Sequence, residues 1–346
     1  MISLRWPFRC ATRPALNDRS RTSRHCRSWY LAALLAFMPL SVLAQAYPSR
    51  PITLIVPAAA GGTTDTVARV LAQIIQTQTN ATVIVDNKSG ASGSIGVASA
   101  TRATPDGYTL LFTIQDAVTI YPLLNKNAPY RVPADFTPIL QFGTANVAYF
   151  VKSNSKITTL NELVQLAKEK PGKVSYSSAG YGTTSHFALE MLKQTNQIEI
   201  LHIPYKGSGP QMAAVLADEV VFTSTTPIGA KGFIDGGQLR PLATTGRLRN
   251  AAIPDVPMVG ETGLPPFTVE VWFGVLGPAK MDEKVAATID QIFKRAVASP
   301  EFQLRAKQLG MDLSRPLSLD AFKDDLVAET KKWEKLIKDS NMALEQ

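Results

Sequence analysis

Short apolar runs alternate with helical patterns from residue 47 onward. Ile52–Val56 is a run rich in β-branched residues, and Pro57–Gly62 is a loop of small residues. From Val67 on, apolar side chains recur at i, i+3, i+4, i+7 and i+8, which predicts a helix that begins near Thr63. The next strands are predicted at Thr82–Asp86 and Thr109–Thr113. Strands that alternate with helices are typical of an α/β fold.

A second unit repeats this order in the middle of the chain. Its strands are predicted at Val147–Val151, Val174–Ser177, Ile198–Ile203, Val220–Ser224 and Leu239–Thr244. Its helices are predicted at Leu160–Lys168, from about Thr183, and after the turn Tyr205–Pro210. The amphipathic pattern of Leu319–Lys338 predicts a C-terminal helix that packs through its apolar stripe. The repeated pattern indicates two α/β units.

Residues 1–46 differ from the rest in charge and in hydropathy. They carry seven arginines, one acid, and the apolar run Trp29–Ala44, which small residues follow at Ala44–Ala46. This arrangement predicts a secretory signal peptide that is cleaved before Tyr47, and an uncleaved membrane anchor is the alternative. The chain has a formal net charge of +8, but the residues after 46 hold 29 bases and 27 acids. The near-balance argues against nucleic-acid binding, and we expect a periplasmic protein.

The chemistry-bearing residues do not form a recognised catalytic set. Cys10 and Cys26 both precede the apolar run, so the exported chain would hold neither a disulfide nor a cysteine metal site. His186 and His202 have no zinc-binding spacing, and the chain contains neither a nucleophile elbow nor a phosphate loop. We therefore expect no enzyme activity, no cofactor and no metal. Ser178 or Ser185 with His186 as a hydrolase pair is the weakest alternative.

Two loops share one construction and carry the strongest functional signal. Each follows an apolar strand, consists of small residues and glycines, and opens a helix with two threonines: Pro57–Asp65 and Ser178–Ser185. A helix start exposes unpaired N–H groups and a partial positive charge, and glycine lets a ligand approach the backbone. Neither loop contains a base. The pattern predicts that both loops bind one carboxylate through backbone dipoles and hydroxyls in a shared cleft.

The chain also resembles the substrate-binding proteins of tripartite tricarboxylate transporters, the Bug family, across nearly all of its length after residue 46. The resemblance rests on these segments: Tyr47–Pro57, Gly61-Gly62-x-x-Asp65, Val85–Asn87, Gly90–Gly93, Pro105–Tyr108, Ser177–Gly180, Pro204–Gly207, Pro254–Pro257, Glu261–Leu264 and Trp272–Gly274. It implies a type II periplasmic-binding fold, in which two α/β lobes enclose a central ligand cleft. It further implies a first lobe of residues 47–148 plus 266–346 and a second lobe of residues 149–265.

The resemblance implies a receptor that binds a small carboxylate and delivers it to the large and small membrane subunits of a transporter. We expect it to work as a monomer. Periplasmic ligand sensing for a membrane kinase is an alternative that the sequence leaves open. The implied ligand-binding residues are Ala59, Ala60, Gly61, Thr63, Thr64, Thr113, Ser178, Ala179, Gly180, Thr183, His186 and Thr225. Asp65 is assigned to hydrogen bonding within its own loop, because a carboxylate there would repel the ligand.

Three departures from the family pattern affect the expected ligand. Ala58–Ala60 stand where many relatives carry Phe and Pro, and Val221 and Thr225 stand where an Asp is frequent. Gln115–Asp116 replace small polar residues. These differences leave the carboxylate anchor in place and leave the identity of the ligand open.

Overall fold

The computed structural model describes residues 47–339 apart from 314 and 315, and the predicted signal peptide lies outside the described residues. The first sheet has the strand order β11-β4-β10-β3-β1-β2 and forms the first lobe. Its strands are β1 (Ile52–Val56), β2 (Val83–Asn87), β3 (Thr109–Thr113), β4 (Phe136–Asn146), β10 (Glu270–Pro278) and β11 (Leu317–Ser318). β1 is parallel to β2 and β3, whereas β10 runs antiparallel to both β3 and β4.

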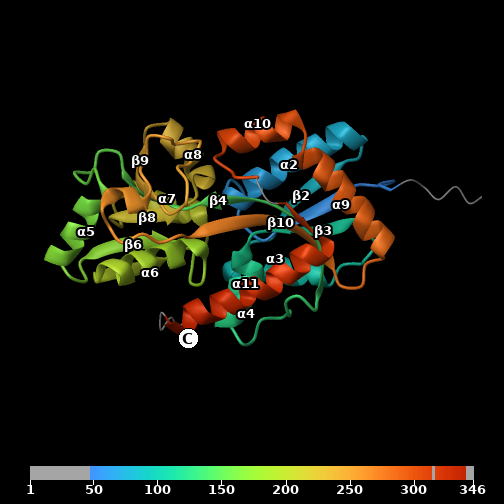
Figure 1. Cartoon of the computed structure of the whole chain (residues 1–346), viewed down its shortest axis with the longest axis horizontal. Helices are drawn as coiled ribbons and strands as arrows, with labels where there is room; N and C mark the ends of the chain where they lie inside the picture. Colours follow the sequence, from blue (N-terminus) through green and yellow to red (C-terminus); the bar gives the residue numbers. More distant parts are fainter. Residues whose placement is uncertain (1–46, 314–315, 340–346) are drawn as a thin grey trace, which may run out of the picture. The chain divides into compact units, whose positions relative to one another are not determined.

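Helices cover both faces of the first sheet (Figure 1). One face carries α2 (Thr63–Thr79), α9 (Glu283–Val297) and α10 (Pro300–Gln308), and the other carries α3 (Ser94–Thr101), α4 (Tyr121–Leu124) and α11 (Leu319–Asp339). Each face has its own core: Leu71, Ile289 and Phe302 pack on the first, and Val97, Phe322 and Leu326 on the second. Two short turns, η1 (Ala91–Gly93) and the π-helical η2 (Asp116–Ile120), follow β2 and β3.

The second sheet has the strand order β7-β6-β8-β5-β9 and forms the second lobe. Its strands are β5 (Ala148–Lys152), β6 (Val174–Ser178), β7 (Ile200–Pro204), β8 (Phe222–Thr225) and β9 (Leu239–Thr244). The helices are α5 (Leu160–Glu169), α6 (Thr184–Asn196), α7 (Ser208–Leu216) and α8 (Pro227–Asp235), with the short η3 (Val259–Thr262). Leu163 and Leu189 pack on one face of this sheet, and Met212 and Ala230 on the other. The predicted α/β class is confirmed.

Two segments of the chain connect the sheets. The chain passes from β4 to β5 at Val147 and returns between β9 and β10. Thr245 ties the two passages together, because its N–H donates to the carbonyl oxygen of Val147 at 2.8 Å and its hydroxyl donates to that of Val269 at 2.5 Å. Thr245 is fully buried. The passages therefore form one cross-linked connection, which is where any motion of one lobe against the other has to bend the chain.

Candidate functional site

A cavity of about 590 Å³ lies between the two lobes. Turns and helix starts from both sheets line it, together with the apolar side chains of Ile114, Val147 and Val271 from the region where the chain crosses. Both loops that the sequence singled out reach this cavity: the first through Pro57–Ala59 with Thr63 and Thr64, the second through Ala179–Tyr181 with Thr183–Ser185. The expectation that they share one cleft is therefore confirmed. A cavity of this size matches a small-molecule site.

The first loop leaves the start of α2 without a cap. Its N-cap residue is Gly62, which is extended (φ −79°, ψ 176°) and offers no side-chain acceptor. Within the described residues, the N–H groups of Thr63 and Thr64 and the hydroxyl of Thr64 have no hydrogen-bond partner. Thr63 and Thr64 both line the cavity. A 17-residue helix therefore directs its free donors and the positive end of its dipole at the space between the lobes.

Asp65 stabilises the first loop from behind the cavity. Its buried carboxylate accepts the N–H of Gly61 at 2.8 Å and lies 2.9 Å from Nε of Arg69. Burial alone would raise the pKa of Asp65, but hydrogen bonds from Arg69, Gly61 and Asn87 lower it below its usual value. Gly61 adopts φ +78°, a conformation that favours glycine. The bond to Gly61 confirms the prediction that Asp65 hydrogen-bonds within its own loop. The side chain of Asp65 is not part of the cavity lining.

The second loop directs its N–H groups inward, onto its own side chains. Ser185 accepts the N–H of Ala179 at 3.0 Å, and Ser178 accepts that of Gly180 at 3.2 Å. Nδ1 of His186 accepts the N–H of Gly182 at 3.3 Å. The hydroxyl of Thr183 caps α6 by accepting the N–H of His186. The second loop thus satisfies most of its own donors, and in the described residues only the N–H of Ser185, the second residue of α6, has no partner at this helix start. The first loop leaves the N–H groups of both Thr63 and Thr64 free.

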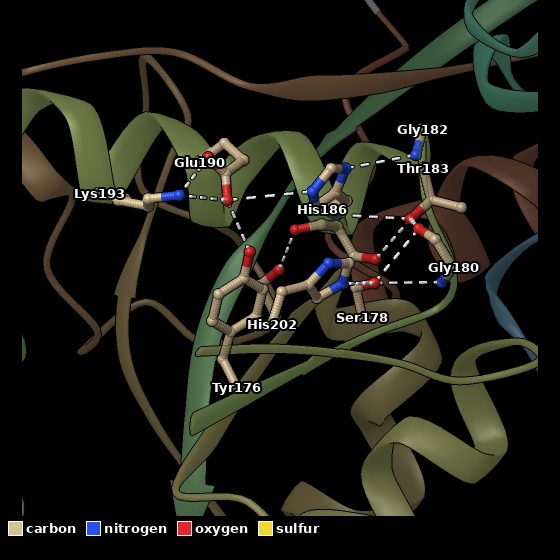
Figure 2. A network of polar contacts seen from close by, with 11 residues as sticks. Tyr176, Ser178, Gly180, Gly182, Thr183, His186, Glu190, Lys193 and His202 are labelled. Atoms are coloured by element: carbon tan, nitrogen blue, oxygen red, sulfur yellow. Dashed lines mark hydrogen bonds and ion pairs between the residues drawn. The ribbon is translucent and has the colours of Figure 1, made fainter. Parts of the chain in front are cut away.

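Buried His186 and partly buried His202 hold the second loop in this shape (Figure 2). The rings of His186 and His202 stack with centroids 4.4 Å apart, and Nε2 of His202 lies 2.6 Å from the hydroxyl oxygen of Ser178. Burial lowers the pKa of His186 to about 4, and burial together with the neighbouring His186 lowers that of His202 to about 3. Both rings are neutral at neutral pH, which lets Nδ1 of His186 accept the N–H of Gly182.

The same contacts separate the serines from the proposed hydrolase base. Ser185 bonds to Ala179 and Thr183, and Ser178 bonds to His202 rather than to His186. Ser178 is fully buried and lies outside the cavity lining. Neither serine is therefore placed as a nucleophile that His186 activates. Among the described residues, no group of three His, Cys, Asp or Glu side chains is arranged to hold a metal ion.

The structure brings seven of the twelve expected ligand-binding residues to the cavity wall: Ala59, Thr63, Thr64, Ala179, Gly180, Thr183 and Thr225. The other five do not line it. Ala60 and Gly61 are exposed at the outer side of the first loop. Thr113 is fully buried with its hydroxyl bonded to the carbonyl oxygen of Ile114, and Ser178 and His186 support the second loop from within.

Several lining residues were not among those expected. The turns Ser89–Gly93 and Pro204–Ser208 both reach the cavity, and so do Asp116 and Gln211. Glycine-rich composition in both turns is the signal that could have found them. Asp116 is the one acid and Lys206 the one base among the lining residues. The cavity wall is therefore almost uncharged. The starts of α2 and α7, whose N-cap residues Gly62 and Gly207 offer no side-chain acceptor, both reach it, and backbone donors at such helix starts can interact with an anion.

Comparisons with known proteins agree with this arrangement. A family model described as "Tripartite tricarboxylate transporter family receptor" matches residues 67–342. A UPF0065 protein from the tcbD–tcbE intergenic region of Pseudomonas sp. (strain P51) is 32% identical over 296 residues, which are 84% of this chain and 87% of that protein. Protein BugT of Bordetella pertussis is 33% identical over 259 residues, 75% of this chain and 79% of the relative.

Solved structures show the same fold. The periplasmic binding protein BugD has a TM-score of 0.80 at 32% identity, covering 86% of this chain and 99% of its own. An R. palustris protein solved with adipate has a TM-score of 0.82 at 26% identity (86% and 99% covered). MatC from Rhodopseudomonas palustris, solved with bound malate, has a TM-score of 0.77 at 25% identity (84% and 100% covered).

Fold and site together define a two-lobed periplasmic solute-binding protein, as the sequence predicted. The chain belongs to the TctC family of tripartite tricarboxylate transporter receptors, the group that includes the Bug proteins. Members of this family are extracytoplasmic receptors and not enzymes. None of the helices in the described part of the chain is both long enough and apolar enough to span a membrane.

Proposed function

We propose that this receptor binds a small carboxylate at the uncapped start of α2, in the cavity between the lobes. The observation that carries the proposal is the pair of unpartnered N–H groups of Thr63 and Thr64 at the cavity wall. A carboxylate there would accept both N–H groups and would lie at the positive end of the helix dipole. Relatives that hold adipate and malate support an acid as the ligand.

The remaining expected residues take two roles in this proposal. Ala59, Ala179, Gly180, Thr183 and Thr225 form the wall around the bound acid. Gly61, Ser178 and His186 act through the shape of their loops, because their polar atoms are bonded within those loops. Ala60 and Thr113 have no ligand contact in this arrangement. The hydroxyl of Thr64, which has no protein partner in the described residues, supplies the one side-chain donor of the anchor.

We also propose residues 47–148 with 266–346 as the first lobe and 149–265 as the second, joined at the connection through Thr245. The strands support these limits to within one residue: β4 and β10 belong to the first sheet, and β5, which begins at Ala148, through β9 to the second. A ligand that contacts both lobes favours the closed form by the difference in its affinity for the two forms. Closure around the acid would present the receptor to its transporter in a ligand-dependent shape.

Export and delivery complete the proposed role. A cleaved signal peptide over residues 1–46 would deliver the chain to the periplasm, and the basic and apolar composition of that segment supports this route. There the receptor would act as a monomer that hands its ligand to the large and small membrane subunits of a tripartite tricarboxylate transporter. The family description, which names a receptor of this transporter, supports the partner.

The test is a binding screen on purified residues 47–346. Native mass spectrometry first identifies any acid that co-purifies, and thermal unfolding is then measured with mono-, di- and tricarboxylates. A true ligand at a hundredfold excess over its Kd should stabilise the fold by about 2.7 kcal/mol. Stabilisation by uncharged or cationic solutes alone, with none from any acid, would contradict the proposed function.

A further inference from the structure

Asp116 differs in charge from the other residues that line the cavity. It begins η2, directly after β3 and Gln115, and it is half-buried at the cavity wall. It carries the only carboxylate among the lining residues. Because the anchor at α2 attracts anions, a fixed carboxylate elsewhere in the same cavity must influence which acids are accepted.

The side chain of Asp116 is held by contacts with the second lobe. Its Oδ2 accepts the N–H of Thr184, the first residue of α6, at 2.9 Å, and its Oδ1 accepts the hydroxyl hydrogen of the same residue. Both donors are neutral. The carboxylate keeps further lone pairs on its two oxygens, so it can accept additional hydrogen bonds from a ligand.

Gln115 fixes the backbone from which Asp116 projects. The side chain of Gln115 donates to the carbonyl oxygen of Glu270 at 2.6 Å and accepts the N–H of Trp272 at 2.8 Å. It also donates to the hydroxyl of Thr184 at 3.2 Å. Gln115 is 1% exposed. In this structure the backbone at Gln115 is therefore fixed by β10, and the carboxylate of Asp116 is positioned by the start of α6.

No base neutralises this carboxylate. None of the ion pairs among the described residues involves Asp116. Lys206 is the one base that lines the cavity, and it belongs to a different turn, in which the N–H of Gly207 bonds to Ala179 of the second loop. Burial raises the pKa of Asp116 to about 6, so the group is still mainly ionised at neutral pH. The cavity therefore offers an anion-binding anchor and, separately, a fixed negative charge.

We propose that Asp116 is a specificity-determining residue, which selects acids whose second polar group donates a hydrogen bond and rejects acids with a second carboxylate. An ammonium or hydroxyl group would donate to the free lone pairs of Asp116, whereas a second carboxylate would be repelled. The preferred class is thus an amino acid or hydroxy acid with one free carboxylate. This inference rests on the proposed carboxylate-binding function, and it separates this receptor from the relatives that hold adipate and malate.

The test is a calorimetric titration of residues 47–346 near neutral pH with two matched series of acids. The four-carbon series is butyrate, 4-hydroxybutyrate, 4-aminobutyrate and succinate, and the six-carbon series is hexanoate, 6-hydroxyhexanoate, 6-aminohexanoate and adipate. In the series whose length reaches Asp116, we expect the amino or hydroxy acid to bind at least about tenfold more tightly than the dicarboxylate. The simple alkyl acid should lie between them.

The variant Asp116→Asn removes the charge and keeps an acceptor for the N–H of Thr184. It should weaken binding of the amino acid about tenfold and strengthen binding of the dicarboxylate about tenfold, so that the order of their affinities reverses. Asp235→Asn, on the exposed end of α8, makes the same change in net charge and should leave the order unchanged. Tightest binding of a dicarboxylate by the unaltered protein, or equal effects of Asp116→Asn on all acids, would overturn the inference but not the receptor function. Failure of every acid in both series to bind would overturn both.

Discussion

The starts of α2 and α6 look alike in sequence and differ in what they offer a ligand. Each follows a strand and a glycine-bearing turn, and each contains two adjacent threonines. In α2 the helix begins at the first of them, Thr63, so Gly62 is the N-cap and the first N–H groups stay free. In α6 the helix begins at the second, Thr184, so Thr183 becomes the N-cap and its hydroxyl accepts the N–H of His186.

A shift of one residue in helix start therefore decides whether a side chain caps the helix. A threonine at the N-cap satisfies one of the exposed N–H groups, whereas a glycine there satisfies none. Asp116 accepts a second N–H at the start of α6, that of Thr184. A glycine-rich turn before a helix therefore does not by itself leave N–H groups free, because the N-cap residue decides whether a side chain accepts one of them.

Proline at the first helical residue gives the largest expected difference between the two starts. Thr63→Pro removes an N–H at a position where proline fits, because Gly62 before it is extended. We expect the affinity for the bound acid to fall by about a hundredfold, as for a lost hydrogen bond to a charged group. Calorimetric titration measures the change.

Two variants control for other effects of that substitution. Thr63→Val removes the bond between the hydroxyls of Thr63 and Thr226 but keeps the N–H, and it should cost affinity much less. Thr184→Pro removes the N–H that Asp116 accepts, so it should lower the free energy of unfolding by about 1–3 kcal/mol and change affinity for a simple monocarboxylate only slightly. Equal losses of affinity from Thr63→Pro and Thr184→Pro would contradict the proposal that the acid binds at the start of α2 and not at that of α6.

The low pKa of His186 predicts how the free energy of unfolding depends on pH. Unfolded chains take up a proton on His186 near pH 6.5, whereas burial lowers the pKa of the folded state to about 4. The unfolded state then binds more protons between these values, so the free energy of unfolding falls as the pH falls through this window. The His186 contribution should be about 3 kcal/mol, fully present above pH ~6.5. Urea unfolding at a series of pH values measures it.

The variant His186→Asn isolates that contribution. Asparagine retains an acceptor near the position of Nδ1 for the N–H of Gly182, and it does not titrate. Its free energy of unfolding should decline less steeply from pH ~7 to ~4 than that of the unaltered protein. Identical slopes for the two proteins would show that His186 is not held neutral by the fold.

A smaller effect is expected from the free hydroxyl at the start of α2. Thr64→Val replaces that hydroxyl with a methyl group of the same shape, and we expect about a tenfold loss of affinity. Thr77→Val makes the same change near the other end of the helix, where the hydroxyl bonds to the carbonyl oxygen of Gln73 and is exposed. If the Kd of Thr64→Val equals that of Thr77→Val, the hydroxyl of Thr64 does not donate to the bound acid.

The smallest effect is expected from Lys206, the one base at the cavity. Its side chain is exposed, so its attraction for an acid is screened by water and salt. Lys206→Ala should weaken binding by only about twofold at physiological ionic strength. A loss as large as that of Thr63→Pro would mean that a paired charge, rather than backbone N–H groups, holds the ligand.

Much of the fold was predictable because its strands carry uninterrupted apolar runs. Thr109–Thr113 and Leu239–Thr244 have the predicted bounds, and the predicted helix start at Thr63 is confirmed. The crossing strands β4 and β10 were not predicted. Both contain glycines, at Gly143 and Gly274, which suggest turns in a sequence. Their cause is close packing instead: a side chain at Gly143 would collide with Leu313, and one at Gly274 with Phe322.

The candidate site was predictable only in part, because it too depends on contacts between residues that lie far apart in the sequence. Composition showed that both loops could approach a ligand, but the direction of each N–H group depends on partners far away in the sequence. His202 supports Ser178 from β7, and Asp116 reaches Thr184 from the other lobe. Such contacts follow from tertiary structure, so local sequence patterns could not separate the open helix start from the closed one.

A crystal structure of residues 47–346 with its tightest-binding acid tests the central claim most directly. The account predicts carboxylate oxygens within about 3 Å of the backbone nitrogens of Thr63 and Thr64, with the contacts of the second loop to Ser178 and His186 intact. A carboxylate bound at Lys206, or one that displaces Asp116 from the start of α6 while the start of α2 stays empty, would contradict it.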